Sequence, residues 1–438
     1  RSHTAMAAFR PKLSRAPSIW ADTDENVAGR LKDYAEAAGL DIAGGTVRRT
    51  SSRFCLGVEH GDYNGTALFG VGTDRYIWVA YKPNASGRCR LYSANFEAAG
   101  VVDFASGEQP KPPLSPDAAA SWARFPHGVD AVLRGAGLFA TSKGFDAVVW
   151  GNIPGGGMSR SASLCLNLIG VFLDVNGAKP RETGGLAAAV TLAVAVENDY
   201  VGSPCGNLDQ IMIHYAKAGF GTYYDPATDA IDYVPLGEDH EDYAIVALDT
   251  GTDRPGLDKS TYKVRRAQCD GFAKELFASN FIATPKLGAV KDDAVYDQVR
   301  AAYASGAFQQ HFKCFDYIYR AQRRFDAMMD AWRRGDVATV GALFREDGLG
   351  LRDDYAISGP ELETMCDIAR TVDGVYGERM LGGGDKGAAG AIVAAAAVDA
   401  LVSAVRRAYP KAHPAYKDKF ATHVVHPCDG VAVLPGLL

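Results

Sequence analysis

The segment NIPGGGMSRSASL, residues 152–164, places three consecutive glycines ahead of a run of small hydroxyl residues. Glycine lets other groups approach the backbone closely, and N–H groups ahead of a helix attract anions. The serine hydroxyls can bind a phosphate or a magnesium ion. The residue types therefore fit a phosphate-binding loop, although a strand-to-helix turn with serine caps is an equally good interpretation of the segment alone.

A second cluster of polar residues lies in SSRFCLGVEHGDYNGT, residues 51–66. Arg53, Glu59, His60 and Asp62 follow one another on an expected strand and its turn. A polyhydroxylated ligand needs hydrogen-bond donors and acceptors in one place, and these four side chains supply both. The alternative is a solvated loop in which Asp62 makes only a local turn.

A second glycine segment, GGGDKG at residues 382–387, fits the pattern G-x-G-x-x-G. No acidic residue stands about 20 positions further on to bind a ribose hydroxyl, and no parallel strand follows promptly. A dinucleotide site is therefore not expected there. The pattern G-x-x-x-x-G-K-[ST] of P-loop proteins does not occur in the sequence.

Strands and helices that could position these clusters follow from the hydrophobic pattern. A strand at 145–153 leads into the first glycine segment, and the helix after it, SASLCLNLIGVFLDV, is apolar on nearly all sides and should be buried. Two more helices are expected before residue 216, and helices dominate after residue 262. Further strands are expected at 53–58, 66–70, 75–82, 89–93, 243–250 and 374–381, and helices at 116–138, 262–278, 292–305, 311–334 and 360–372.

The alanine-rich stretch GAAGAIVAAAAVDALVSAV begins at Gly387. Alanine is the strongest helix former, so the stretch is predicted to form a buried or half-buried helix. It carries Asp399 and is mostly alanine and glycine, which argues against a membrane span. The closing segment HVVHPCDGVAVL is expected to form a strand.

Composition limits the classes of function. The 438 residues, of which 47% are hydrophobic and 22% charged, are typical of a globular protein of two domains. A net charge of −6 without a basic stripe argues against a nucleic-acid partner, and no apolar run is long enough for a membrane span. Eight scattered cysteines without a C-x-x-C pair predict a reducing, cytoplasmic location. The opening RSHTAMAAF is interpreted as a cloning remnant within a flexible stretch, 1–16.

The cluster at residues 51–66 resembles the first motif of the galactokinases, a family within the GHMP small-molecule kinases. GNIPGGGMSRSASL is similar to their phosphate-binding second motif, and GERMLGGGDKGA, residues 377–388, takes the place of the third. The segments ENDYVGSPCGNLDQ, YKVRRAQC and LRDDYAISGPELE resemble further family landmarks in the same order. The first-motif pattern R-x-x-L-x-G-E-H-x-D-Y-N-G is met by Arg53, Leu56, Glu59, His60, Asp62, Tyr63, Asn64 and Gly65.

This resemblance implies an α+β fold of two domains with the active site in the cleft between them. The N-terminal domain, a β-sheet with helices, is expected at 17–245 and would carry the sugar and nucleotide motifs. A ferredoxin-like α+β domain is expected at 246–438.

The implied activity is transfer of phosphate from ATP to the anomeric hydroxyl of D-galactose, with ATP and Mg²⁺ as cofactors. The expected partners are the sugar and ATP alone, and the expected state is a monomer. Alternatives are a kinase for a related sugar, such as L-arabinose, galacturonate or N-acetylgalactosamine, or a sugar sensor without turnover.

The resemblance also implies a role for individual residues. Asp209 matches the catalytic aspartate and Arg53 its partner. Sugar contacts are expected from Glu59, His60, Asp62, Gly206 and Tyr262. Magnesium contacts are expected from Ser161 and Glu197, and nucleotide contacts from Gly155, Gly156, Gly157, Ser159, Arg160, Ser161 and Ala162.

Arg160 stands where the family has a serine, next to a glycine segment that is one residue shorter than usual. A guanidinium can replace lost N–H donors to a phosphate because its fork matches phosphate oxygens. We therefore expect Arg160 to bind phosphate. The alternative is that it points to solvent or pairs with an acid such as Asp385.

Overall fold

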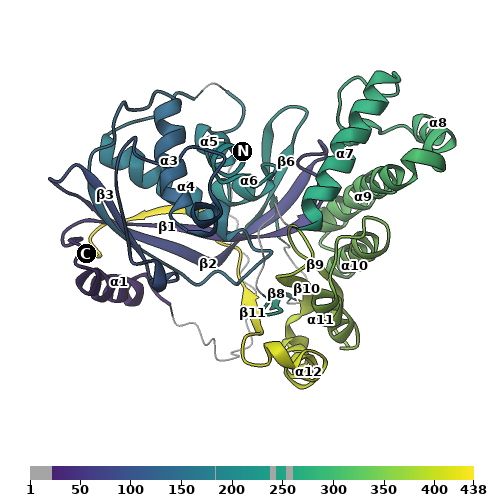
Figure 1. Ribbon diagram of the computed structural model, residues 1–438. Helices are drawn as coiled ribbons and strands as arrows, with labels where there is room; N and C mark the ends of the chain where they lie inside the picture. Colours follow the sequence, from purple (N-terminus) through teal and green to yellow (C-terminus); the bar gives the residue numbers. More distant parts are fainter. Residues whose placement is uncertain (1–21, 183, 237–242, 253–259) are drawn as a thin grey trace, which may run out of the picture.

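The computed structural model describes residues 22–182, 184–236, 243–252 and 260–438, and the expected N-terminal remnant at 1–16 lies outside these ranges. The described chain forms two sheets with helices packed on them (Figure 1). Both α-helices and β-strands are present in each half, so the α+β class expected from the sequence is confirmed. No helix in these ranges is both long and apolar enough to cross a membrane.

The first sheet has eight strands in the order β12-β1-β2-β5-β3-β4, with β6 paired to β2 and β7 to β6. Only the β3–β5 pair is parallel among the pairs described. Its strands are β1 (Thr46–Gly57), β2 (Leu68–Pro83), β3 (Arg88–Ser93), β4 (Val101–Ala105), β5 (Phe145–Gly151), β6 (Phe220–Asp225), β7 (Ala230–Pro235) and β12 (Val431–Leu434).

Helices cover both faces of this sheet (Figure 1). The helix α1 (Asp24–Ala38) packs on one face, against Trp78 and Val148. The opposite face carries the remaining helices of this half. They are α2 (Pro116–Ala120), α3 (Arg124–Gly135), α4 (Arg160–Asn176), α5 (Ala188–Ala195), the π-helical turn η2 (Val196–Val201) and α6 (Leu208–His214).

The helix α4 follows the glycine segment and is buried on nearly all sides, as its apolar sequence predicts. It begins after Ser159, whose backbone is left-handed at φ 63°, and ends at Gly177, also left-handed at φ 62°. Its one central amide, Asn167, donates to the Ile77 carbonyl oxygen at 2.9 Å and so ties the helix to β2. The helix therefore holds the glycine segment rigidly over the sheet.

The second sheet has four antiparallel strands in the order β11-β8-β10-β9. They are β8 (Tyr243–Asp249), β9 (Val375–Met380), β10 (Ala388–Ala394) and β11 (Ala421–Val425). Helices of this half lie beside and beyond the sheet (Figure 1). They are α7 (Thr261–Ala278), α8 (Asp293–Tyr303), α9 (Gln309–Arg334), α10 (Val337–Asp353), α11 (Pro360–Arg370) and α12 (Val398–Ala412).

The prediction of a helix for the whole alanine-rich stretch is wrong in its first half, because Ala388–Ala394 form the inner strand β10. Gly390 explains why small residues are needed there, since a Cβ at this position would lie 2.3 Å from Phe54 Cζ of the first sheet. Close packing and two flanking strands outweigh the helix propensity of alanine. Only α12 keeps the expected helix.

The expected domain boundary between residues 245 and 246 falls inside β8, which belongs to the second sheet along its whole length. The last strand, β12, returns to pair with β1. The division at this boundary remains a proposal.

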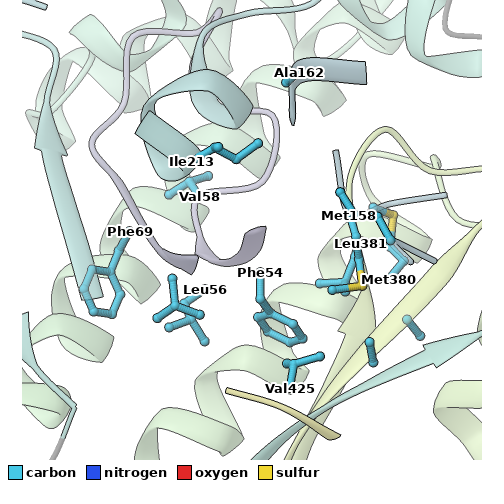
Figure 2. Close-up of a cluster of buried hydrophobic side chains, with 14 of the residues drawn as sticks. Phe54, Leu56, Val58, Phe69, Met158, Ala162, Ile213, Met380, Leu381 and Val425 are labelled. Atoms are coloured by element: carbon cyan, nitrogen blue, oxygen red, sulfur yellow. The ribbon is translucent and has the colours of Figure 1, made fainter. Parts of the chain in front are cut away.

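One hydrophobic core runs from the first sheet to the second beneath the glycine segments. Figure 2 shows side chains from β1, from α4 and from the second sheet gathered in it. The labelled residues are Phe54, Leu56, Val58, Phe69, Met158, Ala162, Ile213, Met380, Leu381 and Val425.

Candidate active site

A cavity of about 310 Å³ opens where the two halves of the chain meet. It brings together the polar turn after β1, both glycine segments, η2 and the first residues of α6 and α7. All expected site residues line it except Ala162. Ala162 is fully buried in the core below, and its contact with nucleotide remains a prediction.

Arg53 and Asp209, which are 156 positions apart, meet at the cavity. Arg53 Nε and Nη2 donate to Asp209 Oδ1 at 2.8 and 2.6 Å, and Nη1 donates to the Gly157 carbonyl oxygen at 2.7 Å. Burial of Arg53 opposes its charge, but the carboxylates of Asp209 and Glu59 outweigh this and raise its pKa. The guanidinium is therefore a permanent cation between a carboxylate and the glycine segment.

Glu59 is 2% exposed and lies between two arginines. Its Oε2 accepts a hydrogen bond from Arg379 Nη2 at 3.0 Å, and its Oε1 lies 3.7 Å from Arg53 Nη2. Burial raises the pKa of Glu59, while the two guanidinium groups lower it. Two positive charges thus compensate a carboxylate that is nearly buried at the edge of the cavity.

Asp62 is held by backbone N–H groups from two segments. Its Oδ1 accepts from Tyr63 N at 2.9 Å and its Oδ2 from Leu208 N at 3.2 Å. Burial raises the pKa of Asp62, against these two N–H groups. Gly206 makes the contact possible, because a Cβ there would lie 2.0 Å from Asp62 Oδ2. The expected sugar residues Asp62 and Gly206 therefore depend on each other.

His60 and Tyr262 form an aromatic wall of the cavity. Their ring centroids are 5.4 Å apart, and His60 Nδ1 lies 3.2 Å from the Tyr63 hydroxyl. The His60 backbone is left-handed, with φ at 63°. Such a backbone is costly for a residue other than glycine, and packing of the ring holds it in place.

The two glycine segments pack directly against each other. A Cβ on Gly157, whose φ is +80°, would lie 2.7 Å from the Leu381 carbonyl oxygen. A Cβ on Gly387, with φ +108°, would lie 2.7 Å from the Gly156 carbonyl carbon. Close backbone contact between the segments is therefore one reason for the glycines, whatever ligand the loop binds.

Serines of the first glycine segment face the cavity beside Glu197. Ser161 hydrogen-bonds Glu197, and Gln210 Nε2 donates to Glu197 Oε2 at 2.5 Å. Burial raises the pKa of Glu197 to about 7, against the hydrogen bond from Ser161. The buried Ser159 Oγ has no hydrogen-bond partner among the described residues.

Arg160 is exposed at the start of α4, and its Nη2 donates to the Ile153 carbonyl oxygen at 2.8 Å. Asp385 accepts a hydrogen bond from Thr261 N at 2.6 Å. The Gly155 N–H, which we expected to face a phosphate, donates to Asp249 Oδ2 at 3.1 Å. Phosphate contacts by Gly155 and Arg160 remain predictions.

Sequence reasoning missed several residues around the cavity. Phe96, Arg124 and Phe125 line it, and Arg379 holds Glu59 from outside it. Arg379 lies in the segment GERMLGGGDKGA that resembles the third family motif, but that resemblance implied no role for it. The other three lie outside every motif, so the sequence offered no signal for them.

The arrangement suits transfer of a phosphoryl group to a hydroxyl. A carboxylate oriented by a cation can accept a hydrogen bond from the attacking hydroxyl, while N–H and O–H donors neutralise phosphate charge. Hard oxygen ligands, such as those of Ser161 and Glu197, are those that Mg²⁺ prefers, and it is commonly bound through one or two carboxylates. No cluster of three or more His, Cys, Asp or Glu residues suited to a metal occurs in the described part of the chain.

Comparison with known proteins gives the family. The family model described as GHMP kinases N terminal domain matches residues 127–217. A galactokinase of Lacticaseibacillus casei is 32% identical over 362 residues, which cover 80% of this chain and 86% of the relative. A galactokinase of Streptococcus suis is 32% identical over 385 residues, covering 86% and 93%.

Solved structures agree. The galactokinase of Lactococcus lactis, solved in complex with galactose, superposes with a TM-score of 0.78 at 27% identity and covers 93% of this chain and 99% of that one. The mevalonate kinase of Methanococcus jannaschii shares the fold, with a TM-score of 0.58 at 12% identity and coverage of 88% and 99%. Similarity to galactokinases over 80–86% of the chain and the shared two-sheet fold lead to one assignment: this chain belongs to the galactokinase family of GHMP kinases and is a sugar kinase.

Proposed function

We propose that this chain transfers the γ-phosphoryl group of ATP to the anomeric hydroxyl of D-galactose. The observation that carries the proposal is the Arg53–Asp209 pair, set between the sugar motif and the glycine segment in one cavity. The similarity to galactokinases supports D-galactose as the sugar. Membership in a kinase family implies the use of ATP.

In the proposed reaction, Asp209 accepts a hydrogen bond from the anomeric hydroxyl and orients its oxygen toward the γ-phosphorus. A bond forms between that oxygen and phosphorus, and the bond from phosphorus to the bridging oxygen of ADP breaks. The hydroxyl proton passes to Asp209 and then to solvent. A weak base suffices because the transition state of phosphoryl transfer is loose. Arg53 neutralises charge on the moving group.

Sugar contacts are assigned to Glu59, His60, Asp62, Gly206 and Tyr262, all of which line the cavity. By the resemblance, Glu59 and His60 contact the 6-hydroxyl. A charged carboxylate at this place would repel a sugar acid and would lose a partner with a sugar that lacks the sixth carbon.

The residues around the first glycine segment fit ATP and Mg²⁺. Ser159 Oγ, which has no hydrogen-bond partner in the described part of the chain, and the N–H groups of Gly156 and Gly157 are candidates for binding phosphate oxygens. Ser161 and Glu197 are candidates for binding the metal. Bound Mg²⁺ would neutralise phosphate charge. Ionised Glu197 is the form that can ligate it, and Ser161 already favours that form. A monomeric state and a cytoplasmic location remain predictions from the sequence.

A coupled assay of ADP release tests the proposal across D-galactose, L-arabinose, D-galacturonate and N-acetylgalactosamine. We expect the highest kcat/KM with D-galactose and a phosphorus–proton coupling to the anomeric proton in the product spectrum. Faster turnover of another sugar would mean that this sugar, and not D-galactose, is the substrate. No ADP release with any of them, despite binding of galactose and ATP, would point to a sensor.

A further inference from the structure

Arg379 is a fully buried arginine at the end of β9 with three partners, two of them carboxylates. Its Nη2 donates to Glu59 Oε2 at 3.0 Å and to the Cys55 carbonyl oxygen at 2.9 Å. Its Nη1 donates to Asp347 Oδ2 at 2.6 Å. The guanidinium carbon also lies 4.6 Å from the centre of the Phe344 ring. This cation is thus fixed in position and direction.

We propose that Arg379 is a positioning residue that orients the Glu59 carboxylate for recognition of the sugar. Arg379 occupies Glu59 Oε2, and Glu59 Oε1, which lies 3.7 Å from Arg53, is left as the acceptor for a sugar hydroxyl. The inference rests on the proposed function, because it takes Glu59 as a sugar contact.

Because Glu59 is buried, its carboxylate needs a compensating charge to stay ionised and in one orientation. Glu59 is 2% exposed, and an isolated carboxylate at such a place would favour its neutral form or another rotamer. Arg379 and Arg53 oppose this effect of burial, because each guanidinium group favours the charged form of Glu59. A negatively charged acceptor then binds a hydroxyl more strongly than a neutral one.

Arg379 is held in turn by a second layer. Asp347, on α10, accepts from Arg379, from Tyr317 at 3.2 Å and from Arg324 Nη2 at 3.2 Å. Charges therefore alternate from the catalytic carboxylate to the helix α9. The order is Asp209, Arg53, Glu59, Arg379, Asp347 and Arg324.

The same contacts join the two halves of the site. Cys55 and Glu59 belong to β1 and its turn in the first half, whereas Arg379 stands three residues before Gly382 of the second glycine segment. A change at Arg379 should therefore reach the sugar side first, through Glu59.

Glu378, the preceding residue of β9, provides a comparison. It is also fully buried and bound by two arginines, Arg345 at 2.8 Å and Arg370 at 2.9 Å. These arginines come from α10 and α11, and none of the three residues lines the cavity. The Arg345–Glu378 pair thus also joins β9 to α10 around a buried carboxylate, but the Arg345 side chain is 30% exposed and neither residue contacts the site.

The test compares Arg379→Met with Arg379→Lys and with the control Arg345→Met. Galactose binding is measured by calorimetry, KM for galactose and for ATP by ADP release, and folding by thermal melting. We expect Arg379→Met to weaken galactose binding about tenfold or more and to reduce the preference for galactose over 6-deoxygalactose. KM for ATP should change less than about twofold, Arg379→Lys should recover part of the affinity, and Arg345→Met should leave it unchanged.

Equal galactose affinity in Arg379→Met and Arg345→Met would overturn the inference, as would an equal rise of both KM values. If Arg379→Met does not fold, Asp347→Asn takes its place, and unchanged galactose affinity and preference in that variant overturn the inference. A wild-type chain that binds galactose without turnover refutes only the proposed function, since calorimetry still tests Arg379. A wild-type chain that binds no galactose refutes both.

Discussion

Arg53 directs two N–H groups at a single oxygen of Asp209, with Nε at 2.8 Å and Nη2 at 2.6 Å from Oδ1. The arginine side chain is 3% exposed and that of Asp209 is 30% exposed. The buried Arg53 thus fixes the orientation of the more exposed Asp209. A third contact, from Arg53 to the Gly157 carbonyl oxygen, fixes the distance of Arg53 from the glycine segment. Orientation of the carboxylate is therefore built into the protein before any ligand binds.

Asp209→Asn should remove turnover and spare binding of the sugar. The amide keeps the size of the carboxylate but loses its charge and its ability to take a proton, so we expect kcat to fall by roughly 10²–10⁴. The galactose dissociation constant should change only a few-fold, because the loss falls on the transition state. ADP release and calorimetry measure the two quantities. A variant with wild-type kcat would remove Asp209 from the mechanism.

L-Arabinose should be a poorer substrate than D-galactose. It lacks the sixth carbon, so Glu59 and His60, both buried, would lose the hydroxyl that we assign to them. An unpaired buried polar group costs about 1–3 kcal/mol, which corresponds to roughly five- to 150-fold in kcat/KM. Initial rates with both sugars give the ratio. A ratio near one, or in favour of arabinose, would contradict the assignment.

Gly157→Ala should destabilise the fold, and Gly155→Ala is its matched control. A Cβ at position 157 meets the Leu381 carbonyl oxygen at 2.7 Å with φ at +80°, whereas at position 155 the nearest atoms lie 3.8 Å away. We expect a loss of roughly 1–3 kcal/mol of unfolding free energy for the first and less than about 0.5 kcal/mol for the second. Urea unfolding of both variants checks this, and equal losses would rule out loop packing as the cause.

The substitution Arg160→Ser should weaken the binding of ATP and leave the binding of the sugar unchanged. The guanidinium lies at the cavity and is oriented by the Ile153 carbonyl oxygen at 2.8 Å. A charged, forked donor to phosphate contributes about tenfold or more in affinity over a hydroxyl. Separate titrations with a non-hydrolysed ATP analogue and with galactose measure the two effects. Unchanged nucleotide affinity would mean that Arg160 has only a structural role.

His423 should make the fold sensitive to mild acid. Burial, with a further contribution from Arg75, lowers the pKa of His423 to about 4, while Asp74 opposes this. The unfolded chain binds a proton below pH 6.5 and the folded chain does not, so stability falls as the pH drops from 6.5 toward 4. The expected loss is about 2 kcal/mol at pH 5 relative to pH 7.5.

The variant His423→Gln should lose less stability over the same interval. Asp74 and its partner His426, 2.6 Å apart, are present in both proteins, so their titration cancels in the comparison. Urea unfolding at pH 7.5 and pH 5 gives the four free energies. An identical loss in both proteins would exclude His423 as the source.

The local sequence determined much of the site. The cluster at residues 51–66 and the glycine segment at 152–164 supply eleven of the residues that line the cavity, because each motif places its polar groups close together along the chain. The apolar pattern after Ser161 determined the buried helix α4, since helix periodicity depends on near neighbours. The order of the motifs was sufficient to recognise the galactokinase family.

Contacts between distant segments decided the rest. Alanine-rich residues 388–394 became a strand because β8 and β9 flank them and Phe54 needs the space at Gly390. Arg379 acquired its role only because β9 brings it to Glu59, 320 positions away. Packing between the two glycine segments is likewise invisible in either one alone. Propensity and spacing describe neighbours along the chain, whereas burial and charge compensation depend on which segments the fold brings together.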